Sequence, residues 1–181
     1  MTPEEFDACF DEFHASAERL EMRPFYTVPS EQPRIQAFRD GLPRPVRSVR
    51  TDPWLRRIAV TTAAGKLWSR VRVIDDPPTE YQRYQIPGYV ESQAAGDEIL
   101  IVRRGRVTGL PERDFWLFDY HTDQAFVLFL DYDADGHFLG AQRSASTEDL
   151  AACHAAYDDA YHSAVPLNSY LAAHAESLRA A

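Results

Sequence analysis

The chain has 181 residues, of which 45% are hydrophobic, and it carries a formal net charge of −9. This length suits one domain, and this apolar fraction can fill a hydrophobic core, which argues against a wholly disordered chain. Its hydrophobic runs are far shorter than the roughly 20 residues that cross a bilayer, and its acidic N-terminus is unlike a secretory signal. We therefore expect one cytoplasmic domain over residues 1–181, without membrane contact.

The charge is unevenly distributed along the chain. Residues 44–72 contain eight basic residues and one acidic residue, which gives +7, whereas the segments on either side are acidic. All basic residues except Lys66 are arginines, which form forked contacts with carboxylates and phosphates. This basic segment could bind an anionic partner, or its arginines could pair with the protein's own acids. The overall negative charge disfavours direct binding of nucleic acid.

Hydrophobic spacing and capping residues predict the elements of the N-terminal half. Phe6, Phe10 and Phe13 recur at steps of three and four residues, as on one face of a helix, and Thr2 is a suitable N-cap. The elements expected in chain order are a helix at 3–22, a short strand at 25–29, a second helix at 31–41, a loop at 42–53 and a β-hairpin at 54–75.

The C-terminal half combines apolar, β-branched runs with two helical segments. Pro87 and Gly88 interrupt the segment 80–96, which is therefore expected to be part helix and part turn. The other elements expected are strands at 98–104, 114–121, 125–133 and 137–144, and helices at 148–164 and 167–180. Together these elements predict an α+β domain. We expect a mainly antiparallel sheet of about five to seven strands, packed against an N-terminal helix and C-terminal helices.

The segment DYDADGHFLGAQ begins like a calcium-binding loop. Asp131, Asp133, Asp135 and Gly136 occupy loop positions one, three, five and six. Position twelve, which supplies a bidentate glutamate in an EF-hand, is the neutral Gln142. Aromatic and β-branched runs flank the loop where an EF-hand has helices. The segment therefore predicts a hairpin turn between two strands, not a calcium site.

Other familiar sites are not apparent in the sequence. His154, Asp158 and His162 are spaced by four on a predicted helix and could offer metal ligands, although a solvated polar face has the same pattern. The two cysteines do not form a CxxC pair, and neither a Gly-rich phosphate loop nor a GxSxG nucleophile elbow is present. We therefore predict no metal site, no cofactor and no identifiable catalytic residue.

Arginine, aromatic and acidic residues recur on the predicted strands. Arg70 and Arg72 lie two residues apart, so both point to the face that Trp68 also occupies. On a concave sheet these residue types could bind an anionic or aromatic small molecule, or they could form cross-strand salt bridges. The candidate ligand-binding residues are Arg70, Arg72, Tyr81, Arg83, Asp114, Trp116 and Asp119.

Several segments are similar, in their order and spacing, to one known family. They are FHASAERLEMRPFYTVPSE, SRVRVIDDPPTEYQRYQ, AAGDEILIV, DFWLFD and DYDADGHFLGA. Together they resemble the actinobacterial domain of unknown function numbered 6879, from about Phe6 to Tyr170. The resemblance implies a regulatory setting, because such chains are often encoded near helix-turn-helix regulators of the XRE type. It implies no catalytic residue.

Two classes of function stay open. The first is a non-enzymatic regulatory or ligand-binding protein of a bacterial signalling system, which acts with a helix-turn-helix DNA-binding partner. The second is a small enzyme that acts on an anionic or aromatic substrate through the Arg, Tyr, Trp and Asp cluster. The lack of catalytic motifs and the negative charge favour the first class.

Overall fold

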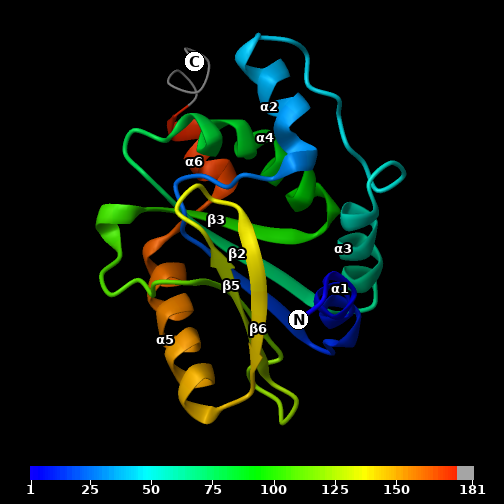
Figure 1. Cartoon of the computed structure of the whole chain (residues 1–181), viewed down its shortest axis with the longest axis vertical. Coiled ribbons are helices and arrows are strands. Elements are labelled where there is room, and N and C mark those ends of the chain that lie inside the picture. Colours follow the sequence, from blue (N-terminus) through cyan, green and yellow to red (C-terminus); the bar gives the residue numbers. More distant parts are fainter. Residues whose placement is uncertain (175–181) are drawn as a thin grey trace.

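The computed structural model describes residues 1–174, and its strands form one seven-stranded sheet (Figure 1). The strand order is β6-β5-β4-β1-β2-β3-β7. Strands β1, β2 and β3 run parallel, and the other neighbouring pairs are antiparallel. The strands are β1 (Ser16–Glu21), β2 (Leu67–Ile74), β3 (Asp97–Arg103), β4 (Asp114–Phe118), β5 (Phe126–Tyr132), β6 (Phe138–Ser144) and β7 (Val165–Pro166).

Helices cover both faces of this sheet. Helix α5 packs on one face, and α1, α3, α4 and α6 pack on the other (Figure 1). The α-helices are α1 (Pro3–Glu12), α2 (Gln32–Arg39), α3 (Pro53–Ala63), α4 (Glu80–Ala95), α5 (Thr147–Ser163) and α6 (Leu167–Ala173). Two short 3-10 helices are η1 (Pro29–Glu31) and η2 (Arg104–Arg106). The α+β class and the mostly antiparallel sheet are therefore confirmed.

The predicted helix over 3–22 is correct only in its first half. Thr2 caps α1 in a capping box with Glu5, and the helix ends at Glu12. The following segment SAERLE is strand β1, which lies inside the sheet between β2 and β4. Its arginine and glutamates are residue types that are common on an exposed helix. Tertiary pairing of these charges overrides that local pattern.

Residues 54–75 do not form the expected hairpin. Asp52 caps helix α3 through the backbone N–H groups of Trp54 and Leu55, and only β2 is a strand. The partners of β2 are the parallel strands β1 and β3, which come from distant parts of the chain. Parallel pairing requires a crossover segment, and α3 and α4 provide it.

Two smaller expectations are also corrected. Residues 25–29 hold only an isolated bridge between Thr27 and His137, and α4 continues as a helix through Pro87. Strands β3, β4, β5 and β6 and helices α2 and α5 lie where the sequence predicts them, within a few residues. The last predicted helix is α6, and residues 175–180 of that prediction lie outside the described residues.

Alternation along the strands separates two hydrophobic cores. Val71 and Val73 of β2 face α5, whereas Trp68 of the same strand faces α1 and α3. As predicted, Phe10 and Phe13 pack on the second face together with leucines of β5. Within residues 1–174, none of the helices combines the length and the apolar character that crossing a bilayer demands.

The acidic segment after β5 is a hairpin turn, as predicted. It joins β5 to β6, and Gly136 has a φ of 79°, a value that few other residues adopt. The Asp133 carboxylate accepts the backbone N–H of His137 at 2.8 Å. Ligand atoms of Asp133, Asp135 and His137 all lie within 4.8 Å of one another.

Truncation of the central aromatic side chain tests the packing of α1. Phe10 is 2% exposed, and its ring lies 5.0 Å from that of Trp54 and 5.2 Å from that of Trp116. We expect Phe10→Ala to lower the free energy of unfolding in urea by about 3–5 kcal/mol. Val60→Ala, on the exposed side of α3, should change it by less than about 0.5 kcal/mol. Equal effects would show that α1 does not stabilise the core.

Calcium is expected to leave the stability of the protein unchanged. The turn joins strands, and the carboxylate of Asp133 already serves the hairpin backbone. The melting temperature, followed by circular dichroism, should therefore be the same with and without millimolar calcium. A rise that saturates with calcium and disappears in Asp135→Asn would contradict this expectation.

Candidate functional site

Charged residues lie side by side on the sheet face that α1, α3 and α4 cover. In the parallel register of β1 and β2, Arg19 lies beside Arg70 and Glu21 lies beside Arg72. Because strand residues alternate between faces, all four side chains leave the sheet on the same side. A core face with this many charges is unusual, since burial of an ion costs several kcal/mol unless it is paired.

Glu21 is the common partner of two arginines. Its carboxylate lies 2.8 Å from Nη1 of Arg70 and 3.8 Å from Nε of Arg72, and Nε2 of Gln85 donates to it at 2.9 Å. Burial alone would raise the pKa of the Glu21 carboxyl, but Arg72, Arg70 and Arg19 lower this pKa to about 2. The carboxylate is thus charged at neutral pH and fixes both guanidinium groups.

Arg19 is paired on one side only. Its Nη2 lies 3.1 Å from the Asp114 carboxylate, which also accepts the Tyr26 hydroxyl and the backbone N–H of Met22. Arg19 is 4% exposed, and its Nη1 atom has no hydrogen-bond partner among residues 1–174. Its guanidinium carbon also lies 5.6 Å from the centre of the Trp116 ring. This buried cation therefore has an N–H donor at Nη1 that no acceptor among the described residues satisfies.

A cavity of about 480 Å³ lies directly over Arg19 and Arg70. We call it the aromatic chamber. Its aromatic lining comes from six separate parts of the chain and includes Phe10, Tyr26, Trp54, Tyr81, Trp116 and Tyr132. This volume is within the usual range for small-molecule sites, which are mainly apolar with a few fixed polar groups.

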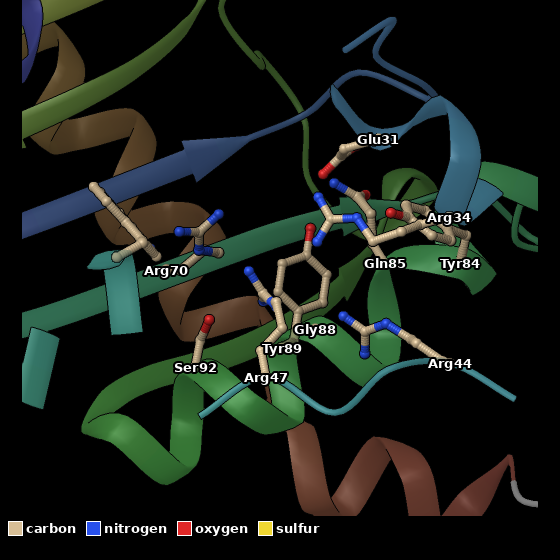
Figure 2. A pocket seen from close by; sticks show the side chains of 11 residues that line it. Glu31, Arg34, Arg44, Arg47, Arg70, Tyr84, Gln85, Gly88, Tyr89 and Ser92 are labelled. Atoms are coloured by element: carbon tan, nitrogen blue, oxygen red, sulfur yellow. The ribbon is translucent and has the colours of Figure 1, made fainter. Parts of the chain in front are cut away.

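A second hollow, of about 200 Å³, adjoins the aromatic chamber. We call it the cationic chamber, because Arg34, Arg44, Arg47 and Arg70 line it. Figure 2 shows Arg34, Arg44 and Arg47 gathered around the ring of Tyr89. Trp54, Arg70 and Gln85 line both hollows, and we call the two hollows together the arginine–aromatic cleft.

Acidic residues hold most arginines of the cationic chamber. Arg44 and Arg47 share the carboxylate of Glu91, at 3.0 and 2.8 Å, and Arg47 also lies 3.1 Å from Asp52. Arg34 makes no salt bridge to the residues that the structure describes. Glu31 also lines this chamber, so Arg34, Arg44 and Arg47 lie near as many carboxylates, those of Glu31, Glu91 and Asp52.

Comparison with known proteins identifies the family of this chain. A family model described as Domain of unknown function (DUF6879) matches residues 4–172. The chain belongs to this DUF6879 family. The match includes every residue of the cleft. Comparison with curated proteins finds no match.

The structure brings some of the predicted ligand residues of this DUF6879 protein into the cleft. Arg70, Tyr81 and Trp116 line the aromatic chamber. Arg72 lies beneath it, is 0% exposed and donates to three backbone carbonyls and to Gln85. Asp114 lies behind Arg19, as its counter-ion. Arg72 and Asp114 thus hold the floor of the cleft rather than face its interior.

Arg83 and Asp119 are not part of the cleft. Arg83 does not fold back toward Arg70 but donates to the carbonyl of Pro78 at 2.8 Å. Asp119, whose φ is 53°, accepts the backbone N–H groups of His14, Ala15 and Ser16 at 2.6–3.0 Å. Neither Asp114 nor Asp119 forms a salt bridge with Arg70 or Arg72. Glu21 does so, together with Asp97, whose carboxylate lies 3.6 Å from Nε of Arg70.

Several cleft residues were missed in the sequence. The sequence predicts Arg19 and Glu21 on a helix and Trp54 in a β-hairpin. Arg44 and Arg47 belong to the recognised basic segment, but their position beside Arg70 depends on the loop between α2 and α3. The net charge of that segment was the one signal that could have identified them.

The opposite face of the sheet has a separate cavity, of about 490 Å³. His154, Asp158 and His162 of α5 line it, and the side chains of Asp158 and His162 are exposed, as on a solvated polar face. Glu18 of β1 also lines it, and burial, together with nearby Asp158, raises the pKa of the Glu18 carboxyl to about 7. The ligand atoms of these residues do not meet closely enough to form a metal-ligand group within residues 1–174.

The two glutamates of β1 should affect stability in opposite directions. The folded protein raises the pKa of Glu18 from 4.5 to about 7, so ionisation of Glu18 destabilises the fold as the pH rises through this range. It lowers the pKa of Glu21 from 4.5 to about 2, so charged Glu21 stabilises the fold above pH 4.5, and this contribution is lost as the pH falls towards 2. At pH 8 we expect Glu18→Gln to raise the free energy of unfolding by roughly 2 kcal/mol. We expect Glu21→Gln to lower it by about 3–5 kcal/mol.

Urea unfolding at pH 8 and pH 4 measures both effects. Each difference from the unmodified protein should become smaller at pH 4, where Glu18 is protonated in both states and Glu21 begins to lose its advantage. If both substitutions changed the free energy of unfolding in the same direction at pH 8, the environments assigned to Glu18 and Glu21 would be wrong. Glutamine keeps the shape of glutamate, so the comparison isolates charge.

Proposed function

We propose that this DUF6879 protein is a non-enzymatic ligand-binding protein with a regulatory role, and that its arginine–aromatic cleft binds an organic anion. The observation that carries the proposal is the unsatisfied Nη1 of Arg19, a nearly buried cation that lines an aromatic cavity. A buried donor without a partner costs free energy, and a ligand acceptor would recover it. A ligand bound in the cleft therefore also stabilises the fold.

The charges that line the aromatic chamber favour binding over acid–base catalysis. A general acid or base works best when its pKa lies near the working pH. Here the pKa of Glu21 is about 2, and burial raises the pKa values of Tyr26, Tyr81 and Tyr132 above their usual range. These groups keep one protonation state around neutral pH. The alternative of a small enzyme that uses the Arg, Tyr, Trp and Asp cluster is correspondingly less favoured.

The regulatory role follows from the setting that the family resemblance implies. Chains of this type are expected beside helix-turn-helix regulators of the XRE type in actinobacteria. This chain carries a net charge of −9, so we propose that it contacts such a regulator and not DNA. Occupation of the cleft would then change the affinity of the regulator for this protein.

Binding of an aromatic anion tests this proposal directly. Anilinonaphthalene sulfonate fluoresces when it enters an apolar cavity, and it carries one negative charge. We expect saturable binding with a single site in the unmodified protein. In Arg19→Lys we expect the affinity to fall about tenfold, because lysine can hold Asp114 but cannot present a second forked donor.

Arg103→Lys is the matched control, because Arg103 lies on β3 outside both chambers. Circular dichroism of each variant establishes that the fold is intact, since this dye also binds partly unfolded chains. Binding that is absent, unsaturable or equally strong in Arg19→Lys would contradict the proposed ligand site.

A further inference from the structure

We propose that the cavity beside α5 binds a small organic ammonium ion, whose charged nitrogen pairs with the carboxylate of Glu18. This cavity, of about 490 Å³, lies on the sheet face opposite to the arginine–aromatic cleft, and we call it the α5 cavity. The two sites share only the aromatic character of part of their lining, and their ligands carry opposite charges. The ammonium site is therefore separate from the organic-anion site of the cleft.

Two glutamates lie in one row across the strands that form the floor of the α5 cavity. In the parallel register, Glu18 of β1 lies beside Ser69 of β2, which lies beside Glu98 of β3. Side chains in register on neighbouring strands leave the sheet on the same side. The hydroxyl of Tyr157 on α5 donates to Oγ of Ser69 at 2.7 Å, so this row faces α5.

The chain supplies hydrogen-bond donors to one glutamate of this row and leaves the other without them. Oγ of Ser69 donates to the Glu98 carboxylate at 3.0 Å, and the hydroxyl of Tyr161 donates to it at 3.3 Å. In contrast, Oε2 of Glu18 is buried and has no hydrogen-bond partner among the described residues. A buried acceptor without a donor costs free energy, which a ligand with N–H donors would recover.

Two further polar atoms of the lining are also unsatisfied. Oγ1 of Thr62 and Nδ1 of His154 are buried and have no hydrogen-bond partner within residues 1–174. Burial lowers the pKa of His154, so its ring is neutral at pH 8 and has one nitrogen that accepts a hydrogen bond. Glu18, Thr62 and His154 can thus all act as acceptors. An ammonium group has donors and no acceptor, so it complements this lining.

The charges of the lining favour a cation. Its acidic residues are Glu18, Glu98 and Asp158. At pH 8 histidine side chains are mainly neutral, which leaves Lys66 as the charged base among the lining residues. Lys66 donates to the backbone carbonyl of Phe13, outside the lining. Burial and the nearby charge of Asp158 raise the pKa of Glu18, so a bound cation would relieve repulsion between these two carboxylates.

The aromatic part of the lining suits the organic portion of such a cation. Tyr157 and Tyr161 lie on successive turns of α5 with ring centres 6.0 Å apart, and both line the cavity. Aromatic faces attract ammonium groups, and the cavity has the volume of a small-molecule site. The acids and histidines of the lining do not form a metal-ligand group within the described part of the chain, which favours an organic cation over a metal ion.

Benzylammonium and benzyl alcohol test the need for charge, because they have the same ring and a similar size. Their binding can be measured by isothermal titration calorimetry at pH 8, above the Glu18 pKa of about 7. We expect benzylammonium to bind saturably at one site. Its affinity should be about tenfold higher than that of benzyl alcohol, because hydrogen bonds between charged groups are stronger than those between neutral groups.

Glu18→Gln removes the charge of the proposed partner and keeps its shape. We expect this variant to bind benzylammonium about tenfold more weakly. The same substitution is expected to raise the stability at pH 8, so unfolding would not explain a loss of binding. Asp159→Asn is the matched control, because Asp159 lies on α5 outside the cavity, and its affinity for benzylammonium should be unchanged.

The outcomes also separate the two ligand sites. Lack of benzylammonium binding, an equal affinity for benzyl alcohol, or an unchanged affinity in Glu18→Gln would overturn the ammonium site. Arg19→Lys should leave benzylammonium binding unchanged, because Arg19 lines the cleft on the other face. Weaker binding of benzylammonium in Arg19→Lys would place this ion in the cleft and would likewise overturn the ammonium site.

Discussion

The contact on which this fold and its cleft depend is the buried carboxylate of Glu21. It holds Arg70 and Arg72 of the neighbouring parallel strand and also accepts a hydrogen bond from Gln85 of α4. One side chain therefore connects β1, β2 and the helix that covers them. Removal of one member of such a network leaves uncompensated charge in the interior, which costs more than loss of an ordinary contact.

Buried ion pairs at the centre of a sheet do not give the most stable core. Hydrophobic replacements of similar volume often equal or exceed the stability of a buried ion pair. Here the charges lie on the sheet face that α1, α3 and α4 cover, where they border both chambers, whereas the core that packs against α5 is mainly apolar. This distribution suggests that the charges serve the cleft. Glu21 pairs with Arg70 and Arg72, while Nη1 of Arg19 and Nε of Arg70 are buried without a hydrogen-bond partner among the described residues.

The sequence predicts strands β3, β4, β5 and β6 well, but it does not predict β1 or the parallel pairing of β1, β2 and β3. Strands β4, β5 and β6 are continuous apolar runs separated by turn residues, and neighbours in sequence are neighbours in space. Strand β1 reads SAERLE, and its identity depends on partners about 50 and 100 residues away. No local pattern shows that its charges are buried. Because this pairing is long-range, the sequence did not identify Arg19 as a residue of the site.

The predicted site shows the same division. The alternation along β2 correctly placed Trp68, Arg70 and Arg72 on one face, and Trp116 proved to be their neighbour across the sheet. Arg83 was misplaced because a position near Arg70 was inferred from a proline break, whereas the continuous helix α4 turns it away. Its helical neighbour Gln85 points to the floor instead and bonds both Arg72 and Glu21. Periodicity thus identified the strand half of the cleft, and the helix half required the three-dimensional path of the chain.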